Sequence, residues 1–217
     1  MSRIFFSLGI LALLLMAATL SIGLYLGDFK AQLLERRQLD REIQTLQTQI
    51  PKPADWEVQL AAARARMAAL DAVRGWFRVH LLLGVGTSLT VILVNCIAVT
   101  YFIGTGRWCR EVVETYRLDP ALAAKSQKLK RRSFPWAALG IASALVISAL
   151  GAAADPGTLR STTDVWATPH LVAAFAGFLV IAWAFFIQWA NIGENHAVIE
   201  EIVARVGEVR REQGLET

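Results

Sequence analysis

The sequence predicts an all-α, polytopic membrane protein with four transmembrane helices and an extracytoplasmic antiparallel helical hairpin between spans one and two. The chain of 217 residues is 55% hydrophobic and has a mean hydropathy of +0.44, an average that soluble domains rarely reach. It also holds four apolar runs without Asp, Glu, Lys or Arg, and each is close to or above the roughly 20 residues that a helix needs to cross a bilayer. These predicted spans are 4–26, 79–104, 134–153 and 169–191.

Residues 4–26 form the first predicted span. A Met-Ser-Arg start followed by an apolar run is also typical of a signal peptide. The run is longer than the usual apolar part of a signal peptide, and no A-x-A cleavage site follows it. We therefore expect an uncleaved signal-anchor helix.

Residues 28–76 are polar, and we expect the helical hairpin there. Two short series of apolar residues follow the alternating spacing of three and four that is typical of coiled coils. Pro51 and Pro53 separate the two series, and Asp55 is a good N-cap for the second helix. Such a hairpin either contacts a partner or merely joins two spans. The series are Leu39, Ile43, Leu46 and Ile50, and then Trp56, Leu60, Ala63, Met67 and Leu70.

The second span, 79–104, is followed by a segment, 107–133, that we expect to be a cytoplasmic basic amphipathic loop. The Gly-Thr-Gly sequence at 104–106 predicts a flexure where the span ends. Helical spacing beyond it predicts a helix along the membrane surface, and Asp119-Pro120 predicts the start of a further short helix. A basic cluster before span three is typical of a topology signal and of anionic lipid headgroup contacts. It comprises Lys128, Lys130, Arg131 and Arg132.

Spans three and four each carry a distinctive face. Small residues recur at every fourth position of span three, 134–153, which lets another helix approach closely. Span four, 169–191, has a polar and small face that we expect inside the bundle, and an aromatic face that suits lipid. The stripe on span three is Gly140, Ala144, Ser148 and Ala152; the inward face of span four is His170, Ala174, Gly177, Ile181, Ala184, Gln188 and Asn191; and its lipid face holds Phe175, Phe178, Phe185 and Trp189.

The tail, 194–212, is amphipathic and is expected to lie on the membrane or to pack on residues 107–132. Basic residues predict the orientation. Span three has its cluster before it and only Arg160 after it, so its start is expected in the cytoplasm. The charges around span one indicate the reverse, but in the hairpin they are nearly neutralised by acids. We therefore expect a multi-pass protein of the plasma (inner) membrane with both termini cytoplasmic and the hairpin outside.

In this topology spans two and four run in the same direction, and both begin with Trp-x-x-x-His-Leu. His80 and His170 are therefore expected at the same depth, with Gly84 and Gly177 further in on their faces. Two histidines on facing helices beside small residues are what a b-type haem needs, because its iron takes two axial imidazoles and the porphyrin edge needs room. The arrangement resembles, in outline, bis-histidine haem proteins built as four-helix membrane bundles. The alternatives are another ion or small-ligand site, including a quinone site, and interfacial histidines bonded to backbone or headgroups.

Asn95, Gln188 and Asn191 predict a polar intramembrane layer in the cytoplasmic half of the bundle. Amides inside a bilayer seek partners on other helices, so this layer is expected to hold helices together. A polar pathway for ions or protons is the alternative. It is less well supported, because no ionisable Asp, Glu, Lys or Arg lies inside any span.

The chain has no G-x-S-x-G elbow, HExxH, Walker loop or C-x-x-C motif, so we do not expect an enzyme. No metal is expected beyond a haem iron. The best-supported function is a structural or accessory subunit, or a scaffold, of a larger membrane complex. The alternatives are a b-type haem electron-transfer or quinone-linked subunit with His80 and His170 as axial ligands, and a small channel or transporter. Expected partners are the lipid bilayer and other membrane subunits or further copies of the chain, with no role for nucleic acid.

Overall fold

The computed structural model describes residues 1–27, 29–155 and 163–215, and these residues are almost entirely helical. The described residues contain no strand. Four of the helices, α1, α3, α4 and α5, are long and apolar enough to cross a membrane. The five helices are α1 (Ser2–Leu26), α2 (Phe29–Thr48), α3 (Trp56–Thr115), α4 (Pro120–Ala154) and α5 (Thr163–Glu212).

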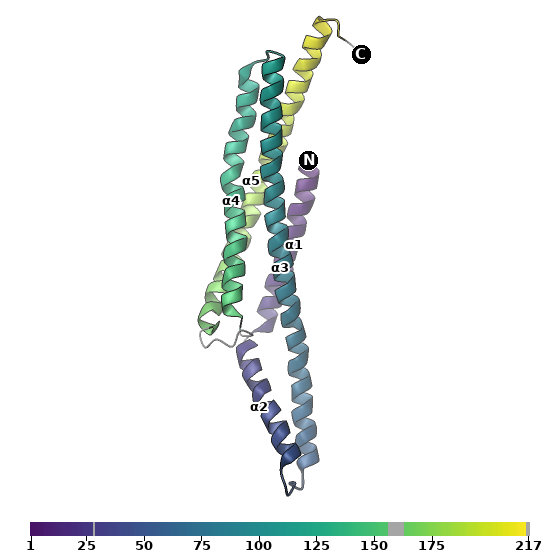
Figure 1. Cartoon of the computed structure of the whole chain (residues 1–217), viewed down its shortest axis with the longest axis vertical. Coiled ribbons are helices and arrows are strands. Elements are labelled where there is room, and N and C mark those ends of the chain that lie inside the picture. The colour runs from purple at the N-terminus through teal and green to yellow at the C-terminus, as the bar shows by residue number, and fades with distance from the viewer. Residues whose placement is uncertain (28, 156–162, 216–217) are drawn as a thin grey trace.

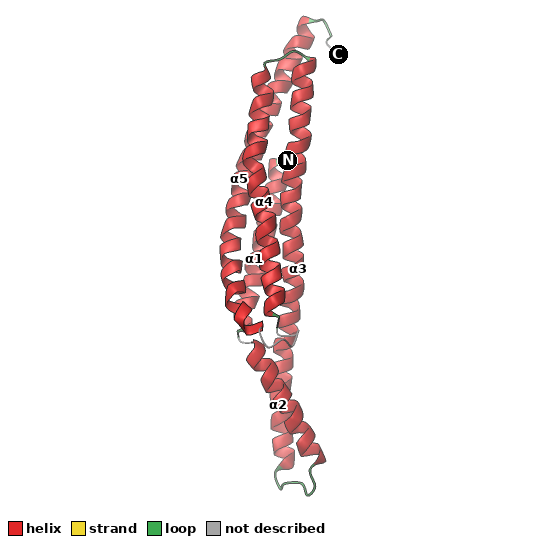
Figure 2. Ribbon diagram, turned by 60° about the vertical axis from the view of Figure 1, so that its left-hand side comes forward, coloured by secondary structure: helices red, strands yellow, loops and turns green. Residues whose placement is uncertain are grey.

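The four long helices form an elongated bundle (Figures 1 and 2). α4 packs against both α3 and α5, and α1 packs against the same two helices, whereas α1 and α4 hardly touch each other. α3 and α5 are therefore diagonal partners that face each other across the bundle. Both run upward in Figure 1, α3 from the bottom of the picture and α5 from the level of the lower end of α1, so their sequences run in the same direction.

α3 is one uninterrupted helix of 60 residues, and it overturns two expectations. The Gly-Thr-Gly sequence at 104–106 does not interrupt it, and the helices expected within 107–133 are parts of α3 and α4, with only residues 116–119 non-helical between them. The reason is tertiary packing. Gly106 faces α4, where the side-chain amide of Gln127 donates to its carbonyl oxygen at 3.1 Å. Cys109 and Val113 are buried beyond it.

α4 and α5 are also continuous where shorter elements were expected. Asp119 caps α4 as the sequence indicates, by accepting from the Ala121 amide at 2.8 Å, but the helix then continues to Ala154. α5 likewise passes through Gly193 without a break. Its final third packs on the 107–132 region, which is one of the two arrangements expected for the tail, and buries Val198 and Ile202 there.

α2 packs along the first part of α3, and the chain turns between them at residues 49–55 (Figure 1). Glu35 pairs with Arg66 at 2.8 Å and Arg36 with Asp71 at 3.0 Å. The hydrogen bond to Asp71 raises the pKa of Arg36 above its ordinary value. The two expected coiled-coil series are buried in part. The members that are buried are Leu39, Leu46, Leu60 and Ala63.

Two local expectations for this region differ from the structure. Ile50 is 91% exposed because α2 ends at Thr48, before the last position of the predicted series. Asp55 is the N-cap residue of α3, but its carboxylate accepts from the side chain of Gln59 at 2.8 Å and caps no backbone amide. α1 ends at Leu26, and its C-cap residue Gly27 has a φ of 57°, which lies in the left-handed region that glycine adopts readily.

Two predicted helix faces also need correction. Gly140 and Ala144 of the small-residue stripe are buried, but Ser148 and Ala152 are exposed, because the inward face of α4 follows alternating three- and four-residue steps instead of a strict four-residue step. Phe185 was expected to face lipid and is only 4% exposed. It packs edge-on against Phe5 of α1, with ring centroids 6.1 Å apart.

The packing of α2 on α3 makes a testable prediction. Replacing Leu39, which is 2% exposed, with Ala should loosen α2, because truncating a buried leucine typically costs about 2–5 kcal/mol. Hydrogen exchange of the amides in 29–48 should become faster. Ile50→Ala is the matched control and should leave this exchange unchanged; equal effects of the two substitutions would contradict the packing described here.

Candidate functional site

His80 of α3 lies in a notch on α1 made by Gly23. Its Nδ1 donates to the carbonyl oxygen of Thr19 at 3.0 Å. A β-carbon placed on Gly23 would stand only 2.9 Å from Cε1 of the imidazole, so only glycine leaves room for the ring. Because Nδ1 carries the hydrogen of this bond, Nε2 of the neutral ring is left with a free lone pair. Nε2 makes no hydrogen bond to any described residue.

His170 of α5 lies in the same kind of notch on α4. A β-carbon on Gly151 would stand 3.0 Å from Cε1 of this ring. Its Nδ1 is buried and interacts with the backbone of Ile147, but it makes no hydrogen bond of standard geometry.

These notches belong to a two-helix unit that occurs twice, as α1 with α3 and as α4 with α5. Residues 81–98 of α3 and residues 171–188 of α5 have the same pattern of burial. Each residue in the first range is buried, partly buried or exposed like the residue 90 positions later. Four of the five buried positions of α1 correspond likewise to buried positions of α4 that lie 128 positions later. Those pairs are Phe5 with Ser133, Gly9 with Ala137, Ala12 with Gly140, and Met16 with Ala144.

Sequence analysis found the histidines but not the glycines that seat them. Gly84 and Gly177 were expected to provide clearance for a haem. A β-carbon on Gly84 would make only an ordinary contact with the Thr19 methyl group at 3.6 Å, whereas the space beside Gly177 is filled by the Ile147 side chain. Gly23 and Gly151 adjoin the rings instead. Only the pairing of α1 with α3 and of α4 with α5 singles them out from the other glycines.

The polar layer is present as a cross-helix contact in the bundle core. The side-chain amide of Gln188 donates to Oδ1 of Asn95 at 2.9 Å, and Asn95 donates to the Val91 carbonyl at 2.8 Å. Neither side chain is exposed. Gly140 provides the space on α4, because a β-carbon there would stand 2.8 Å from Nδ2 of Asn95. Oε1 of Gln188 is buried without a partner.

The layer continues along α5 as a polar seam that ties it to α3 and α4. Asn191 donates to the Ser133 hydroxyl at 2.9 Å. Asn195, which sequence analysis missed, accepts from Ser126 at 2.8 Å and donates to Tyr101 and Thr105 of α3. The signal was available, because positions 188, 191 and 195 share one helix face. The three α5 side chains of this seam, Gln188, Asn191 and Asn195, are each at most 2% exposed.

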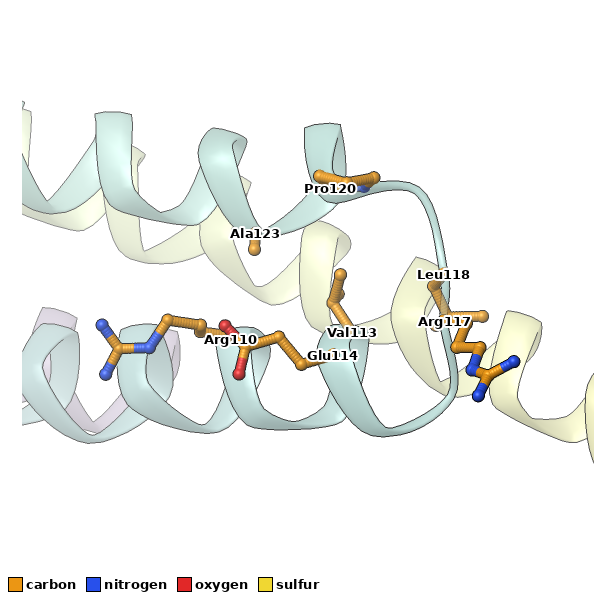
Figure 3. A pocket seen from close by; sticks show the side chains of 7 residues that line it. All are labelled: Arg110, Val113, Glu114, Arg117, Leu118, Pro120 and Ala123. Atoms are coloured by element: carbon orange, nitrogen blue, oxygen red, sulfur yellow. The ribbon is translucent and has the colours of Figure 1, made fainter.

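The basic cluster lies on the first half of α4, beyond the apolar part of that helix. Three of its side chains are exposed, and the ammonium of Lys130 stands 5.9 Å from the ring centre of Phe134. A shallow groove of about 560 Å³ lies nearby, where α3 passes into α4 (Figure 3). None of the predicted site residues lines it. Its lining residues are Arg110, Val113, Glu114, Arg117, Leu118, Pro120 and Ala123.

The described residues contain no group of three or more His, Cys, Asp or Glu side chains placed to hold a metal ion. The chain was compared with protein-family models, curated proteins and solved structures, and none of them matches it.

The Asn95–Gln188 contact predicts a measurable coupling. Asn95→Leu should lower the free energy of unfolding by about 0.5–2 kcal/mol, because it leaves a buried amide without its acceptor. Adding Gln188→Leu should recover part of that loss, because the unpaired amide is then removed as well. Unfolding in detergent, followed by circular dichroism, would measure both.

Cys96→Leu, on the exposed side of the same helix, is the matched control and should have little effect. Losses that simply add up in the double variant would show that the two amides are not coupled.

Proposed function

We propose that this chain is a multi-pass membrane protein that binds one b-type haem between α3 and α5, with Nε2 of His80 and of His170 as the axial ligands. The observation that carries the proposal is the repeated seat: two histidines at equivalent positions of diagonal helices, each held against a glycine of the neighbouring helix. Cofactor sites in helical bundles are built from side chains on such facing helices.

The chemistry of the two rings supports this assignment. An imidazole ligand needs a free Nε2 and an orientation that is fixed by a hydrogen bond from Nδ1, commonly to a backbone carbonyl. The bond from His80 to Thr19 provides this, whereas Nδ1 of His170 lies against the backbone of Ile147 without a hydrogen bond of standard geometry. When bound, a b-type haem supplies one-electron chemistry. The chain would hold the ligands, keep water away and surround the site with apolar side chains.

Exposed apolar side chains support the membrane setting. Leu82, Leu89 and Leu93 of α3 and Leu179 of α5 are each more than half exposed, which lipid tolerates and water does not. We place the basic cluster at the cytoplasmic headgroups of the inner membrane, with both termini cytoplasmic. α2 and the start of α3 would then form an antiparallel hairpin on the outer side, and the histidines would lie in the outer half of the membrane.

A haem carrier without a catalytic motif needs a donor and an acceptor of electrons, so we propose that it acts as an accessory subunit of a larger membrane complex. The α2–α3 pair and the region where 107–132 packs on the end of α5 are the parts that project beyond the apolar segments, and they could contact other subunits or further copies. For the channel or transporter alternative we find less support, because Asn95 and Gln188 are fully buried and bonded to each other.

The visible spectrum of the purified protein tests the proposal. The wild-type chain should show a Soret band and the low-spin spectrum of a six-coordinate haem. That six-coordinate spectrum should be lost in both His80→Ala and His170→Ala. His196→Ala is the matched control, because His196 is exposed and its ring lies beside the carboxylate of Glu200, at 3.5 Å. A fully folded but colourless preparation, produced with haem supplied, would refute the proposal.

The glycine notches can be tested separately. Gly23→Leu and Gly151→Leu should each displace an imidazole and reduce the six-coordinate signal, because their β-carbons would stand within 3.0 Å of a ring. Gly86→Leu serves as the control within the same bundle, since a β-carbon there would meet nothing within 4 Å. An unchanged spectrum in both notch variants would show that the glycines do not seat the ligands.

A further inference from the structure

The two histidine seats differ in how firmly they hold the ring. In the first unit, Thr19 accepts the hydrogen bond from Nδ1 of His80 and is itself fixed to its surroundings. Its hydroxyl donates to the Leu15 carbonyl at 2.8 Å and accepts from the hydroxyl of Thr87 at 3.1 Å. α1 and α3 are thus joined by polar contacts at the level of the ring and again two turns along α3.

The second unit has no hydroxyl at the positions that correspond to Thr19 and Thr87. Ile147 stands where the first unit has Thr19, and Gly177 stands where it has Thr87. The Ile147 side chain fills the space beside Gly177, so this pair makes a packing contact and no hydrogen bond. Nδ1 of His170 is buried without a hydrogen bond of standard geometry. Its orientation is therefore restrained by the glycine notch and by a contact with the Ile147 backbone that falls short of a standard hydrogen bond.

The position of His170 in its helix loosens it further. His170 directly follows Pro169, which has no backbone N–H to donate to the preceding turn. α5 begins at Thr163, so His170 lies within the first two turns of the helix. His80, by contrast, lies more than six turns inside α3, which begins at Trp56.

From this asymmetry we infer that His80 is the permanent ligand and His170 a displaceable one. The reduced site would then take a small neutral diatomic ligand, such as carbon monoxide, on the His170 side. This inference rests on the haem site proposed above. The apolar segments around the rings contain no Asp, Glu, Lys or Arg, which favours a neutral ligand over an anion. The step is a ligand exchange: the bond between iron and His170 breaks, the bond between iron and the diatomic forms, and no proton or electron moves.

The experiment uses the full chain purified with its haem, reduced with dithionite and exposed to carbon monoxide. The wild-type spectrum should shift to that of the carbon monoxide complex. His170→Ala should retain its haem in a five-coordinate, high-spin form that binds carbon monoxide faster than the wild type does. His80→Ala should bind haem about 10–100-fold more weakly than His170→Ala, the range that the loss of one outer hydrogen-bond partner typically costs.

The outcomes separate this inference from the proposal on which it rests. A preparation without haem would refute the haem site itself. A six-coordinate haem that does not react with carbon monoxide would overturn the inference and leave the haem site in place. Equal haem loss in the two histidine variants would also overturn it. His196→Ala again serves as the control, and the reaction of the wild type with carbon monoxide requires no variant that could misfold.

Discussion

Polar side chains within the apolar helices must find their hydrogen-bond partners on other helices, and the bundle depends on this constraint. An unpaired polar group is costly wherever water cannot reach it. Most of the paired ones lie on α3 and α5, the two helices that contact nearly every other element. Thr87 bonds to α1, Asn95 to Gln188, and Asn195 to both α3 and α4. Each of these contacts sets the register of one helix pair, because a shift of one turn would break it.

The repeated unit gives the molecule an approximate symmetry in its packing. The polar side chains beside the two histidines do not follow that symmetry. α1 with α3 and α4 with α5 bury equivalent positions and seat equivalent histidines. The first unit uses threonine hydroxyls where the second uses isoleucine and glycine. The first unit also contains α2, whereas in the second only residues 155–162 separate the two helices. Two nearly equal seats with different support are well suited to a site whose two ligands have different roles.

Packing between the long helices overrides local signals that weaken a helix. Gly-Thr-Gly at 104–106 was expected to bend the chain, and Pro135 and Gly193 also disfavour a helix in isolation, yet α3, α4 and α5 pass through them. Beyond the apolar segments these helices still pack on one another, and ion pairs such as Lys125 with Glu201 at 3.4 Å lie along that contact. The same packing decided the environment of Phe185, which α1 covers. No pattern within span four could show on which side α1 would lie.

The sequence by itself determined the helical class, the four apolar helices, the two histidines and the amides, because hydropathy and helical spacing are local properties of the chain. The matched Trp-x-x-x-His-Leu sequences were enough to suggest a pair of ligands. The tertiary structure alone decided which helices are neighbours. That choice made Gly23 and Gly151 the seats of the rings, placed Ile147 beside Gly177, and left Nδ1 of His170 without the hydrogen bond that His80 has. Such contacts join residues 57 to 61 positions apart in one unit and 19 to 30 apart in the other, so no single spacing in the sequence could reveal both.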